Sequence, residues 1–260
     1  MSVGTNPDTM LAPLRAAVCS QRAMHLQDGW DSFEGWSEGK PARVELDMRL
    51  AEQVPIESRP WLLRVRVPIA SASSPVVDAL IASVRARHEA VLIARLTTDD
   101  ALELVLHGTR HEHLKDAAAS ALARFPGHRA QVRSAHDSSW LHVRERILPN
   151  KYQAQWMHDR RVVDAMRQGG DRIDQPRPID HTVYFRSVES REAFVKGVRA
   201  LGFESDAATD SDGHLRFGLI VRRRDPVTLD HIHAVACELI EHAEEAGGQY
   251  DGWGAPFVDR

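Results

Sequence analysis

Cysteine is scarce in this sequence, because its 260 residues include only Cys19 and Cys237, one in each half. Without a framework of paired cysteines, a reducing interior is the default environment. No stretch approaches the roughly 20 consecutive apolar residues of a membrane-spanning helix. The N-terminus also lacks a basic stretch followed by an apolar core, which is the pattern of a secretory signal. These absences predict a soluble, cytoplasmic protein.

Lysine is also rare, and the familiar catalytic motifs are missing. Four lysines stand against 29 arginines, a bias that indicates a GC-rich bacterial genome and says nothing about mechanism. The sequence contains no Gly-x-Ser-x-Gly, no P-loop, no dinucleotide fingerprint and no His-Glu-x-x-His. It therefore names no enzyme class and gives no reason to expect a cofactor.

Charge is divided unevenly along the chain. Residues 178–260 carry 9 basic and 15 acidic side chains, whereas residues 1–177 carry 24 and 22. The net charge is therefore −6 for the C-terminal segment and +2 for the rest. Because phosphate contacts need a cationic surface, the acidic segment disfavours direct binding of nucleic acid. It favours a protein partner with a basic segment.

Residues 28–147 read as one domain, preceded by a poorly ordered arm over residues 1–27. Apolar residues at every second position predict strands, and helical spacing predicts helices. The expected elements are strands 42–50 and 61–69, helix 75–89, strands 91–97 and 102–107, helix 111–125 and strand 128–132. The order ββαββαβ is a ferredoxin-like plan with one extra strand in front.

A helical linker over residues 148–177, rich in Gly and Pro at its end, is expected to lead into a second domain at 178–260. Its expected elements are strand 180–186, a helix between Ser187 and Gly202, strands 203–208 and 214–222, a helix from Thr228 and a closing strand 249–258. This order is βαββαβ. The predicted fold class is therefore α+β, with two ferredoxin-like domains built on antiparallel sheets.

The closing segment carries a specific pattern, Tyr250-Asp251-Gly252-Trp253-Gly254, with Phe257 after it. Two glycines around a tryptophan are costly on a strand, so the pattern is uncommon. With the acidic helix before it, this segment resembles the RraB family of ribonuclease E inhibitors over residues 178–260. The resemblance implies a non-catalytic protein that binds the basic, Arg-rich region of ribonuclease E. This chain departs from the family in having a further N-terminal domain and no strongly acidic tail.

Residues 28–147 are similar to the uncharacterised DUF695 family. The likeness lies in Trp30 and Phe33, in Gly39-Lys40-Pro41, in Gly108-Thr109-Arg110 and in Asp137-Ser138-Ser139-Trp140. This family supplies no activity.

Two interpretations of the C-terminal pattern lead to a set of candidate contact residues. In the structural interpretation, which we favour, the glycines bend the strand and Trp253 covers the core. In the functional interpretation, Tyr250 and Trp253 face a partner. The long helix adds repeated acids, with Glu244 among them, that can pair with arginines. The candidate partner-binding residues are Glu238, Glu241, Glu245, Tyr250, Asp251 and Trp253.

Three other groups suggest chemistry but have simpler explanations. His107, His111 and His113 invite a metal, yet no further ligand at a usual spacing completes a site. His233 and Cys237 lie four residues apart, but we interpret Cys237 as a small core residue. Arg222-Arg223-Arg224 reads as a solvated strand end, because the segment around it is acidic.

The alternative to a binding protein is an uncharacterised, hydrolase-like enzyme. Its cleft would lie in the N-terminal domain near His107, Arg110 and Asp137, although Asp137 beside His136 and Ser138 fits a turn or cap better. A further alternative is a module that only self-associates through exposed sheet edges.

Overall fold

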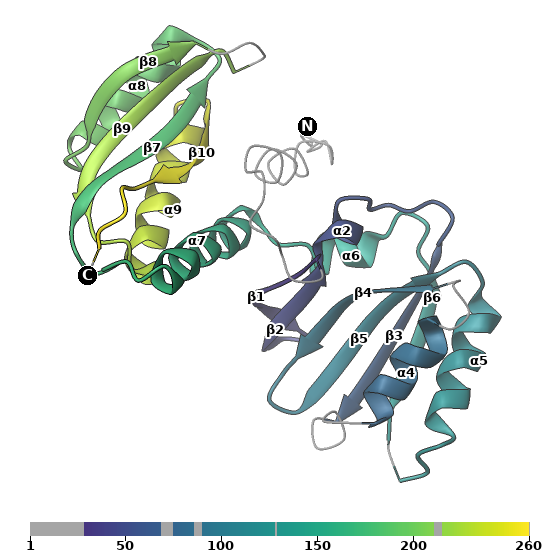
Figure 1. Cartoon of the computed structure of the whole chain (residues 1–260). Helices are drawn as coiled ribbons and strands as arrows, with labels where there is room; N and C mark the ends of the chain where they lie inside the picture. The colour runs from purple at the N-terminus through teal and green to yellow at the C-terminus, as the bar shows by residue number, and fades with distance from the viewer. Residues whose placement is uncertain (1–28, 69–74, 86–89, 128, 211–214, 260) are drawn as a thin grey trace. The chain divides into compact units, whose positions relative to one another are not determined.

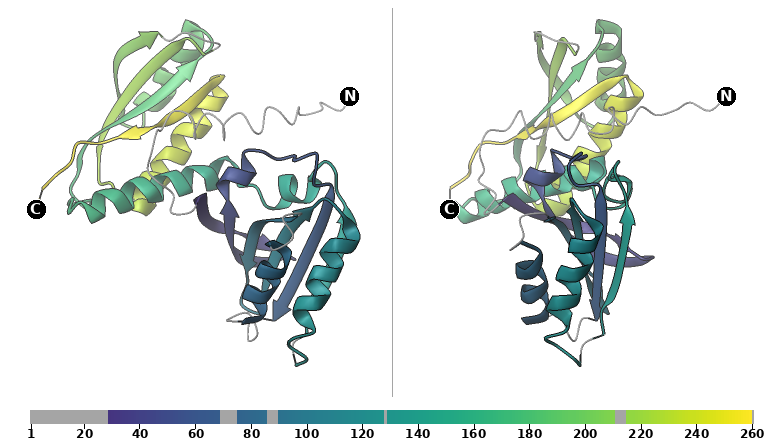
Figure 2. Two further views of the ribbon diagram at one scale, coloured as in Figure 1. Left: turned by 45° about the vertical axis from the view of Figure 1, so that its right-hand side comes forward. Right: turned by 90° about the vertical axis from the view of Figure 1, so that its right-hand side faces the viewer.

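The computed structural model describes residues 29–68, 75–85, 90–127, 129–210 and 215–259, which form two compact units (Figures 1 and 2). The division falls after Gln153, inside helix α7 (Lys151–Gln168). Both units confirm the predicted fold class of antiparallel sheets with helices. The arm expected at residues 1–27 lies outside the described residues.

The N-terminal unit contains a six-stranded antiparallel sheet in the order β1-β2-β4-β5-β3-β6. The strands are β1 (Trp30–Ser37), β2 (Lys40–Asp47), β3 (Trp61–Pro68), β4 (Ala90–Thr97), β5 (Ala101–Gly108) and β6 (Gln131–His136). The four strands β4-β5-β3-β6 have the ferredoxin-like order, and the β1–β2 hairpin extends the sheet beyond β4. Two strands therefore precede the ferredoxin-like unit, where the sequence predicted one.

Helices α4 (Pro75–Arg85) and α5 (His111–Leu122) cover one face of this sheet (Figure 1). The alternating apolar residues of β3 and β5 lie on the face of the sheet that packs against α4 and α5. They form one buried cluster with both helices, which includes Leu63, Val65, Leu80, Leu104 and Leu114. Burial of this cluster supplies the hydrophobic stabilisation of the unit, at about 25 cal/mol per Å² of apolar surface.

Two predicted strand boundaries in this unit are wrong. The strand expected at 42–50 stops at Asp47, because its carboxylate accepts hydrogen bonds from the backbone amides of Arg49 and Leu50 and caps the short helix α2 (Met48–Ala51). The last strand lies at Gln131–His136 and not at 128–132, since pairing with β3 sets its register. A further short helix, α6 (Leu141–Arg146), was not predicted.

The C-terminal unit contains a four-stranded antiparallel sheet in the ferredoxin-like order β10-β7-β9-β8. Its elements are β7 (Arg177–Phe185), α8 (Val188–Arg199), β8 (Glu204–Asp210), β9 (Phe217–Asp225), α9 (Leu229–Glu245) and β10 (Gly248–Gly254). Helices α8 and α9 lie on the same face of the sheet (Figures 1 and 2). The core between them is made of Val183, Phe185, Phe194, Val198, Val221 and Leu239, among others.

The predicted helix signals of this unit act as expected at α8. The Ser187 hydroxyl accepts a hydrogen bond from the backbone amide of Ser190 at 3.2 Å and caps the helix start. Gly202 follows the helix with φ of 85°, a left-handed conformation that favours glycine. Helix α7, in the segment expected to be a linker, adds Val163 to a buried cluster with Ile179, Ile232 and Trp253.

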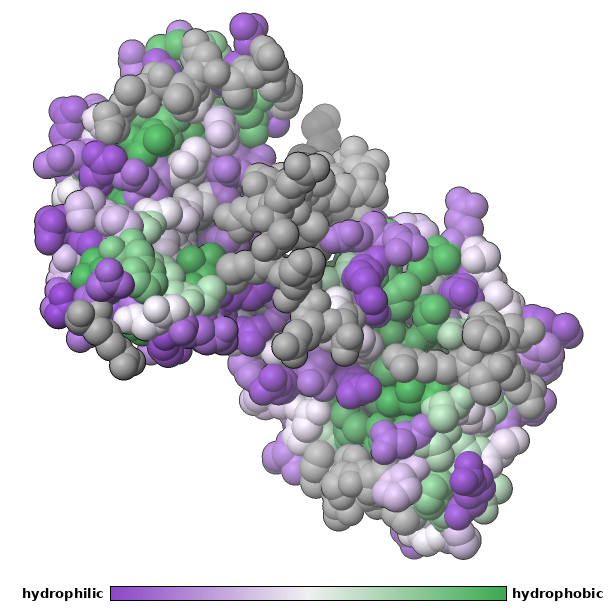
Figure 3. All heavy atoms as spheres, viewed as in Figure 1, coloured by the Kyte–Doolittle hydropathy of each residue, from purple (hydrophilic) through white to green (hydrophobic). Residues whose placement is uncertain are grey.

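Large apolar side chains at the surface come from separate elements. Among the described residues they are Trp36 in β1, Val132 in β6, Leu141 in α6 and Phe257 after β10. The face shown in Figure 3 mixes hydrophilic and hydrophobic residues over both units. Within the described ranges, no helix combines the length and apolar character needed to cross a bilayer.

The packing of β10 against β7 generates a test of the fold. A Cβ atom added at Gly248 would lie 2.4 Å from two ring carbons of Phe185 and 2.9 Å from the Tyr184 carbonyl oxygen. Phe185 is fully buried, so its ring has no space to move. We expect Gly248→Ala to lower the free energy of unfolding by about 1–3 kcal/mol, the usual cost of overpacking.

Gly254→Ala is the matched control on the same strand, because nothing lies within 4 Å of its added Cβ atom. Chemical denaturation of both variants in the full-length chain measures the difference. Equal stabilities would contradict the described contact between β10 and Phe185.

Candidate functional site

The Tyr250–Gly254 pattern forms a β-bulge. In the pairing of β10 with β7, Tyr250 lies opposite Val183 and Gly252 lies opposite Thr182, so Asp251 is the extra residue. Gly252 has a φ of 153°, which a residue with a side chain rarely adopts. Trp253 then lies opposite His181. Since alternate residues of β7 share a face, the bulge turns Tyr250 and Trp253, three residues apart, to the same side of the sheet.

Trp253 ends in a buried polar contact and not at the surface. Its side chain is 7% exposed, and its indole Nε1 donates a hydrogen bond to Oδ1 of Asp159 at 2.8 Å. Asp159 belongs to α7 and is fully buried. Gln155, one turn earlier, donates to the same oxygen at 2.7 Å. This agrees with the structural interpretation of the pattern.

His233 of α9 completes this cluster from a third element. Its Nδ1 atom lies 2.9 Å from Oδ2 of Asp159. The hydrogen bond to Asp159 raises the pKa of His233 to about 9, Cys237 adds to the effect, and burial opposes it. At neutral pH the imidazole is therefore positively charged. The opposite charges offset the large cost of burying a carboxylate alone.

Tyr250 is also held from inside the unit. Its hydroxyl lies 2.9 Å from Nδ1 of His181, a fully buried residue of β7. Burial lowers the pKa of His181 to about 4, so this imidazole is neutral at neutral pH. Burial, followed by the nearby acidic groups, raises the pKa of Tyr250 well above its usual value. Direct contact of Tyr250 and Trp253 with a partner stays a prediction.

The predicted acidic residues lie on the outside of α9. Its buried stripe is formed by Ile232, Val235, Ala236, Leu239, Ile240 and Ala243. On the other side, Glu241 and Glu245 are exposed and Glu238 is half-buried. Their spacing of three and four residues puts these three carboxylates on one side of the helix, here called the acidic face. Asp251 in the neighbouring bulge is half-exposed.

The arginine run of β9 is paired within the unit. Arg222 binds Asp180 at 2.5 and 3.0 Å, and Arg223 binds Asp225 at 2.7 Å. The Arg223 guanidinium also lies 4.3 Å from the centre of the Phe203 ring. Arg224 donates to the carbonyl oxygen of Pro176 at 2.9 Å. These contacts agree with a strand end balanced by neighbouring acids.

In the N-terminal unit, the structure brings His107 and Asp137 together, but in the interior. His107 is fully buried, stacks on Trp140 at 3.7 Å, and lies 3.9 Å from Asp137. Burial lowers its pKa to about 4. Asp137 accepts hydrogen bonds from the amides of Leu141 and His142 and so caps α6, as its simpler interpretation expects. Arg110 is exposed at the start of α5.

Two of the three histidines considered as metal ligands, His107 and His111, have other partners. His111 lies 2.8 Å from the Ser134 hydroxyl and packs against Trp61, whereas Nδ1 of His107 lies 3.1 Å from the Arg59 carbonyl oxygen. In the part of the chain that the structure describes, no group of three or more His, Cys, Asp or Glu side chains is arranged to hold a metal ion.

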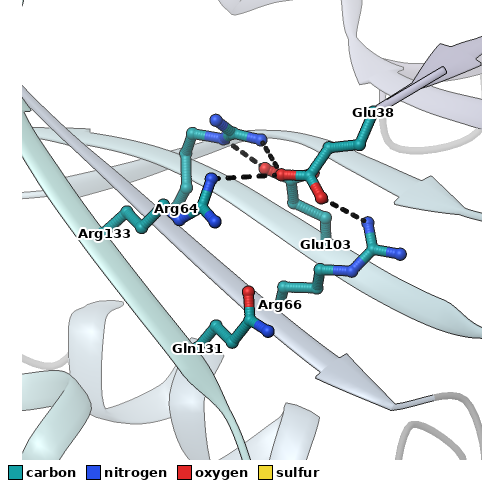
Figure 4. Close-up of a pocket in the computed structure, with 6 residues that line it drawn as sticks. All are labelled: Glu38, Arg64, Arg66, Glu103, Gln131 and Arg133. Carbon is teal, nitrogen blue, oxygen red and sulfur yellow. Dashed lines mark hydrogen bonds and ion pairs between the residues drawn. The ribbon is translucent and has the colours of Figure 1, made fainter.

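Sequence reasoning missed a charged hollow on the sheet of the N-terminal unit (Figure 4). Its lining residues are Glu38, Arg64, Arg66, Glu103, Gln131 and Arg133. Glu38, in the β1–β2 turn, pairs with Arg64 and Arg133 at 3.3 Å and with Arg66 at 3.6 Å. Glu103 is buried and pairs with Arg64. The alternation of Arg64 and Arg66 with apolar residues placed them on this face, but their partners come from distant strands.

Comparison with known families agrees with this architecture. Residues 156–255 match the family described as regulator of ribonuclease activity B, RraB. Residues 74–145 match a family of unknown function, DUF695. The chain joins a DUF695-like domain to an RraB-like domain. Both predicted resemblances and their order are confirmed, and the RraB match begins at Trp156, so it includes Asp159.

Other comparisons add little to the RraB-like assignment. No curated protein matches the chain. A crystal structure of an unknown protein from Galdieria sulphuraria is 14% identical, with 77% of this chain and 98% of that chain covered and a TM-score of 0.22. The structure of a candidate glycine cleavage system transcriptional repressor is 8% identical, with coverage of 77% and 98% and a TM-score of 0.24. At these TM-scores neither structure informs fold or function.

The Trp253–Asp159 bond of the RraB-like domain is testable by removing only the donor. Trp253→Phe keeps an aromatic ring but leaves the buried carboxylate short of one hydrogen bond, so unfolding should become easier by about 1–3 kcal/mol. Trp253→Ala should cost about 3–5 kcal/mol. Trp36→Phe is the control, because Trp36 is 66% exposed. Equal effects at the two tryptophans in urea unfolding would contradict the buried role.

The His233–Asp159 pair predicts how stability changes with pH. The pKa of His233 is raised in the folded state, so its contribution is fully present below the unfolded value of 6.5 and is lost as pH rises through about 9. Unfolding free energy should therefore fall between these two pH values. His233→Gln should show a flatter profile over this window, and parallel profiles for the variant and the original chain would refute the pairing.

Proposed function

We propose that this chain is a non-catalytic regulator that inhibits or modulates ribonuclease E through protein–protein contact. The observation that carries this proposal is the match of residues 156–255 to a family described as a regulator of ribonuclease activity. The resemblance of the Tyr250–Gly254 pattern to RraB proteins, which inhibit ribonuclease E, supplies the enzyme as partner. The partner's basic, Arg-rich region is the element that we expect the chain to bind.

The acidic face of α9 is the docking surface that we propose. Glu245 has 77% of its side chain exposed, and Glu241 is exposed four residues before it. Residues 178–260 carry a net charge of −6, so the domain attracts a basic segment over distances of about a Debye length, roughly 8–10 Å in physiological salt. Charges arranged in this way increase association rates and select partners of opposite charge.

The buried contacts of Asp159 hold this docking surface in a fixed position. Asp159 connects α7 to His233 of α9 and to Trp253 of β10. The helix that carries Glu238, Glu241 and Glu245 is therefore fixed beside the bulge that carries Asp251. A rigid surface loses less conformational entropy on binding than a mobile one.

Charge reversal on α9 tests the docking surface. Glu241→Lys with Glu245→Lys should slow association with the Arg-rich region of ribonuclease E by about tenfold or more at low salt. The difference from the original chain should shrink as salt rises. The thermal midpoint should change little, because exposed charges contribute at most about 1 kcal/mol. Surface plasmon resonance across a salt series measures the association rates of the original chain and of the double variant.

Glu192→Lys with Glu204→Lys is the matched control. Both residues are exposed, lie on α8 and β8 of the same unit, and change its net charge by the same amount. An equal loss of binding in the control pair would mean that net charge, and not the acidic face, governs association.

Cleavage of a long RNA by ribonuclease E, with and without the full-length chain, is the direct functional assay. We expect inhibition by the original chain and by the control pair, and weaker inhibition by the α9 pair. If the chain leaves cleavage unchanged and does not bind the Arg-rich region, the proposed function is wrong.

A further inference from the structure

Cys237 lies next to the charged imidazole of His233. Its Sγ atom is 3.4 Å from Nε2 and 3.9 Å from Nδ1 of His233, and the same Nδ1 atom is 2.9 Å from Asp159. The sulfur, the imidazole and the carboxylate thus form a continuous chain of contacts. Cys237 and His233 are one turn apart on α9, so the helix itself sets their spacing. Asp159 comes from α7, 74 residues before His233.

This order of groups is the arrangement that activates a nucleophile. A histidine cation beside a thiol stabilises the thiolate, and a third group orients the histidine ring. Asp159 is fully buried and holds the ring through Nδ1, and the sulfur lies against the ring, 3.4 Å from Nε2 and 3.9 Å from Nδ1. The protonated ring donates to Asp159 and places its positive charge beside the sulfur, and a thiolate beside a histidine cation is the reactive form of cysteine.

The surroundings distinguish Cys237 from an inert core cysteine. It is a half-buried residue, whereas the apolar stripe of α9 beside it, with Ala236 and Leu239, is fully buried. Part of the residue is therefore exposed to solvent. The ionisable groups around this cluster include Tyr250 on β10, where the pKa of the phenol is raised by burial, by Asp159, by Asp251 and by Cys237.

We propose that Cys237 is an activated thiol that small hydroperoxides oxidise to a sulfenic acid. The site is the Cys237–His233–Asp159 chain of contacts, and its substrate class is a hydroperoxide, either hydrogen peroxide or a small alkyl hydroperoxide. This role does not depend on binding to ribonuclease E.

The proposed oxidation conserves atoms, protons and electrons. Because the His233 ring already carries a proton on both nitrogens at neutral pH, the thiol proton passes to solvent, and the resulting thiolate attacks the terminal oxygen of the peroxide. A sulfur–oxygen bond forms while the oxygen–oxygen bond breaks, so the sulfur loses two electrons and the peroxide gains them. The proton on His233 then passes to the departing oxygen. The products are a cysteine sulfenic acid and water or an alcohol.

The position of the thiol gives the modification a structural consequence. Cys237 precedes Glu238 and lies one turn before Glu241, two residues of the acidic face. It also contacts the histidine that holds α9 to α7. Oxidation would replace a thiolate beside His233 by an uncharged group and would weaken that charge pairing.

The test compares the same thiol in the folded and unfolded chain. In a full-length Cys19→Ser background, Cys237 is alkylated with iodoacetamide at about pH 6.5, where an ordinary thiol of pKa 8.5 holds only about 1% thiolate. We expect the native chain to react about tenfold faster than the chain in concentrated urea, after allowance for the lower nucleophilicity of a more acidic thiol. Peptide mass spectrometry measures both rates.

Two variants identify the cause of the reactivity. His233→Gln should reduce the native rate about tenfold near pH 6.5 and change it little above pH 9, where any thiol is largely ionised. His242→Gln on the same helix is the matched control, and its rate should be unchanged. If His233→Gln does not fold, the comparison of native and unfolded chains still decides the question.

Oxidation itself is measured with hydrogen peroxide in the presence of dimedone, which traps sulfenic acids. We expect a dimedone adduct on the Cys237 peptide of the native chain and much less in His233→Gln. A native thiol that reacts more slowly than the unfolded one is an inert core cysteine, and this result overturns the proposal. Fast alkylation without a dimedone adduct overturns it as well. Because no ribonuclease is present, either failure leaves the proposed function untouched.

Discussion

The buried carboxylate of Asp159 is the constraint on which the C-terminal unit depends. A charge without solvent costs several kcal/mol unless it is paired and hydrogen-bonded, and the three partners of Asp159 come from α7, α9 and β10. Displacement of α9 would leave that charge unpaired, and displacement of β10 would remove one of its hydrogen bonds. The cluster therefore holds the edge of the sheet, the long helix and α7 in one arrangement, which hydrophobic burial alone would not specify.

The bulge in β10 follows from the same constraint. A regular strand would place Tyr250 and Trp253 on opposite faces of the sheet, and only one of them could reach the interior. The extra residue Asp251 and the unusual backbone of Gly252 turn both rings to the core side of the sheet, where the partly buried Tyr250 reaches His181 and the buried Trp253 reaches Asp159. The Tyr250–Gly254 pattern that carries the RraB resemblance therefore has a structural role in the fold.

The two units share a topology but use charge in different ways. In the DUF695-like unit, basic and acidic side chains meet on the sheet, where Arg64, Arg66 and Arg133 pair with Glu38, Glu103 and Asp100. This balance leaves no large field of one sign at that hollow. In the RraB-like unit, the acids of α9 lie outside while the buried charge is satisfied inside. Similar folds can therefore carry different surfaces, and a shared fold says little about shared function.

Local patterns in the sequence determined most of the architecture. Alternation in β3 and β7 and helical spacing in α9 decide which side chains face inward. Ser187 and Gly202 mark the ends of α8. All of these effects act within a few residues of the chain. The acidic face could be read in the same way. Only tertiary structure decided that Asp159 pairs with Trp253, 94 residues away, and that His233 lies between Asp159 and Cys237. These pairings depend on which distant elements pack together, and a single sequence does not state that packing.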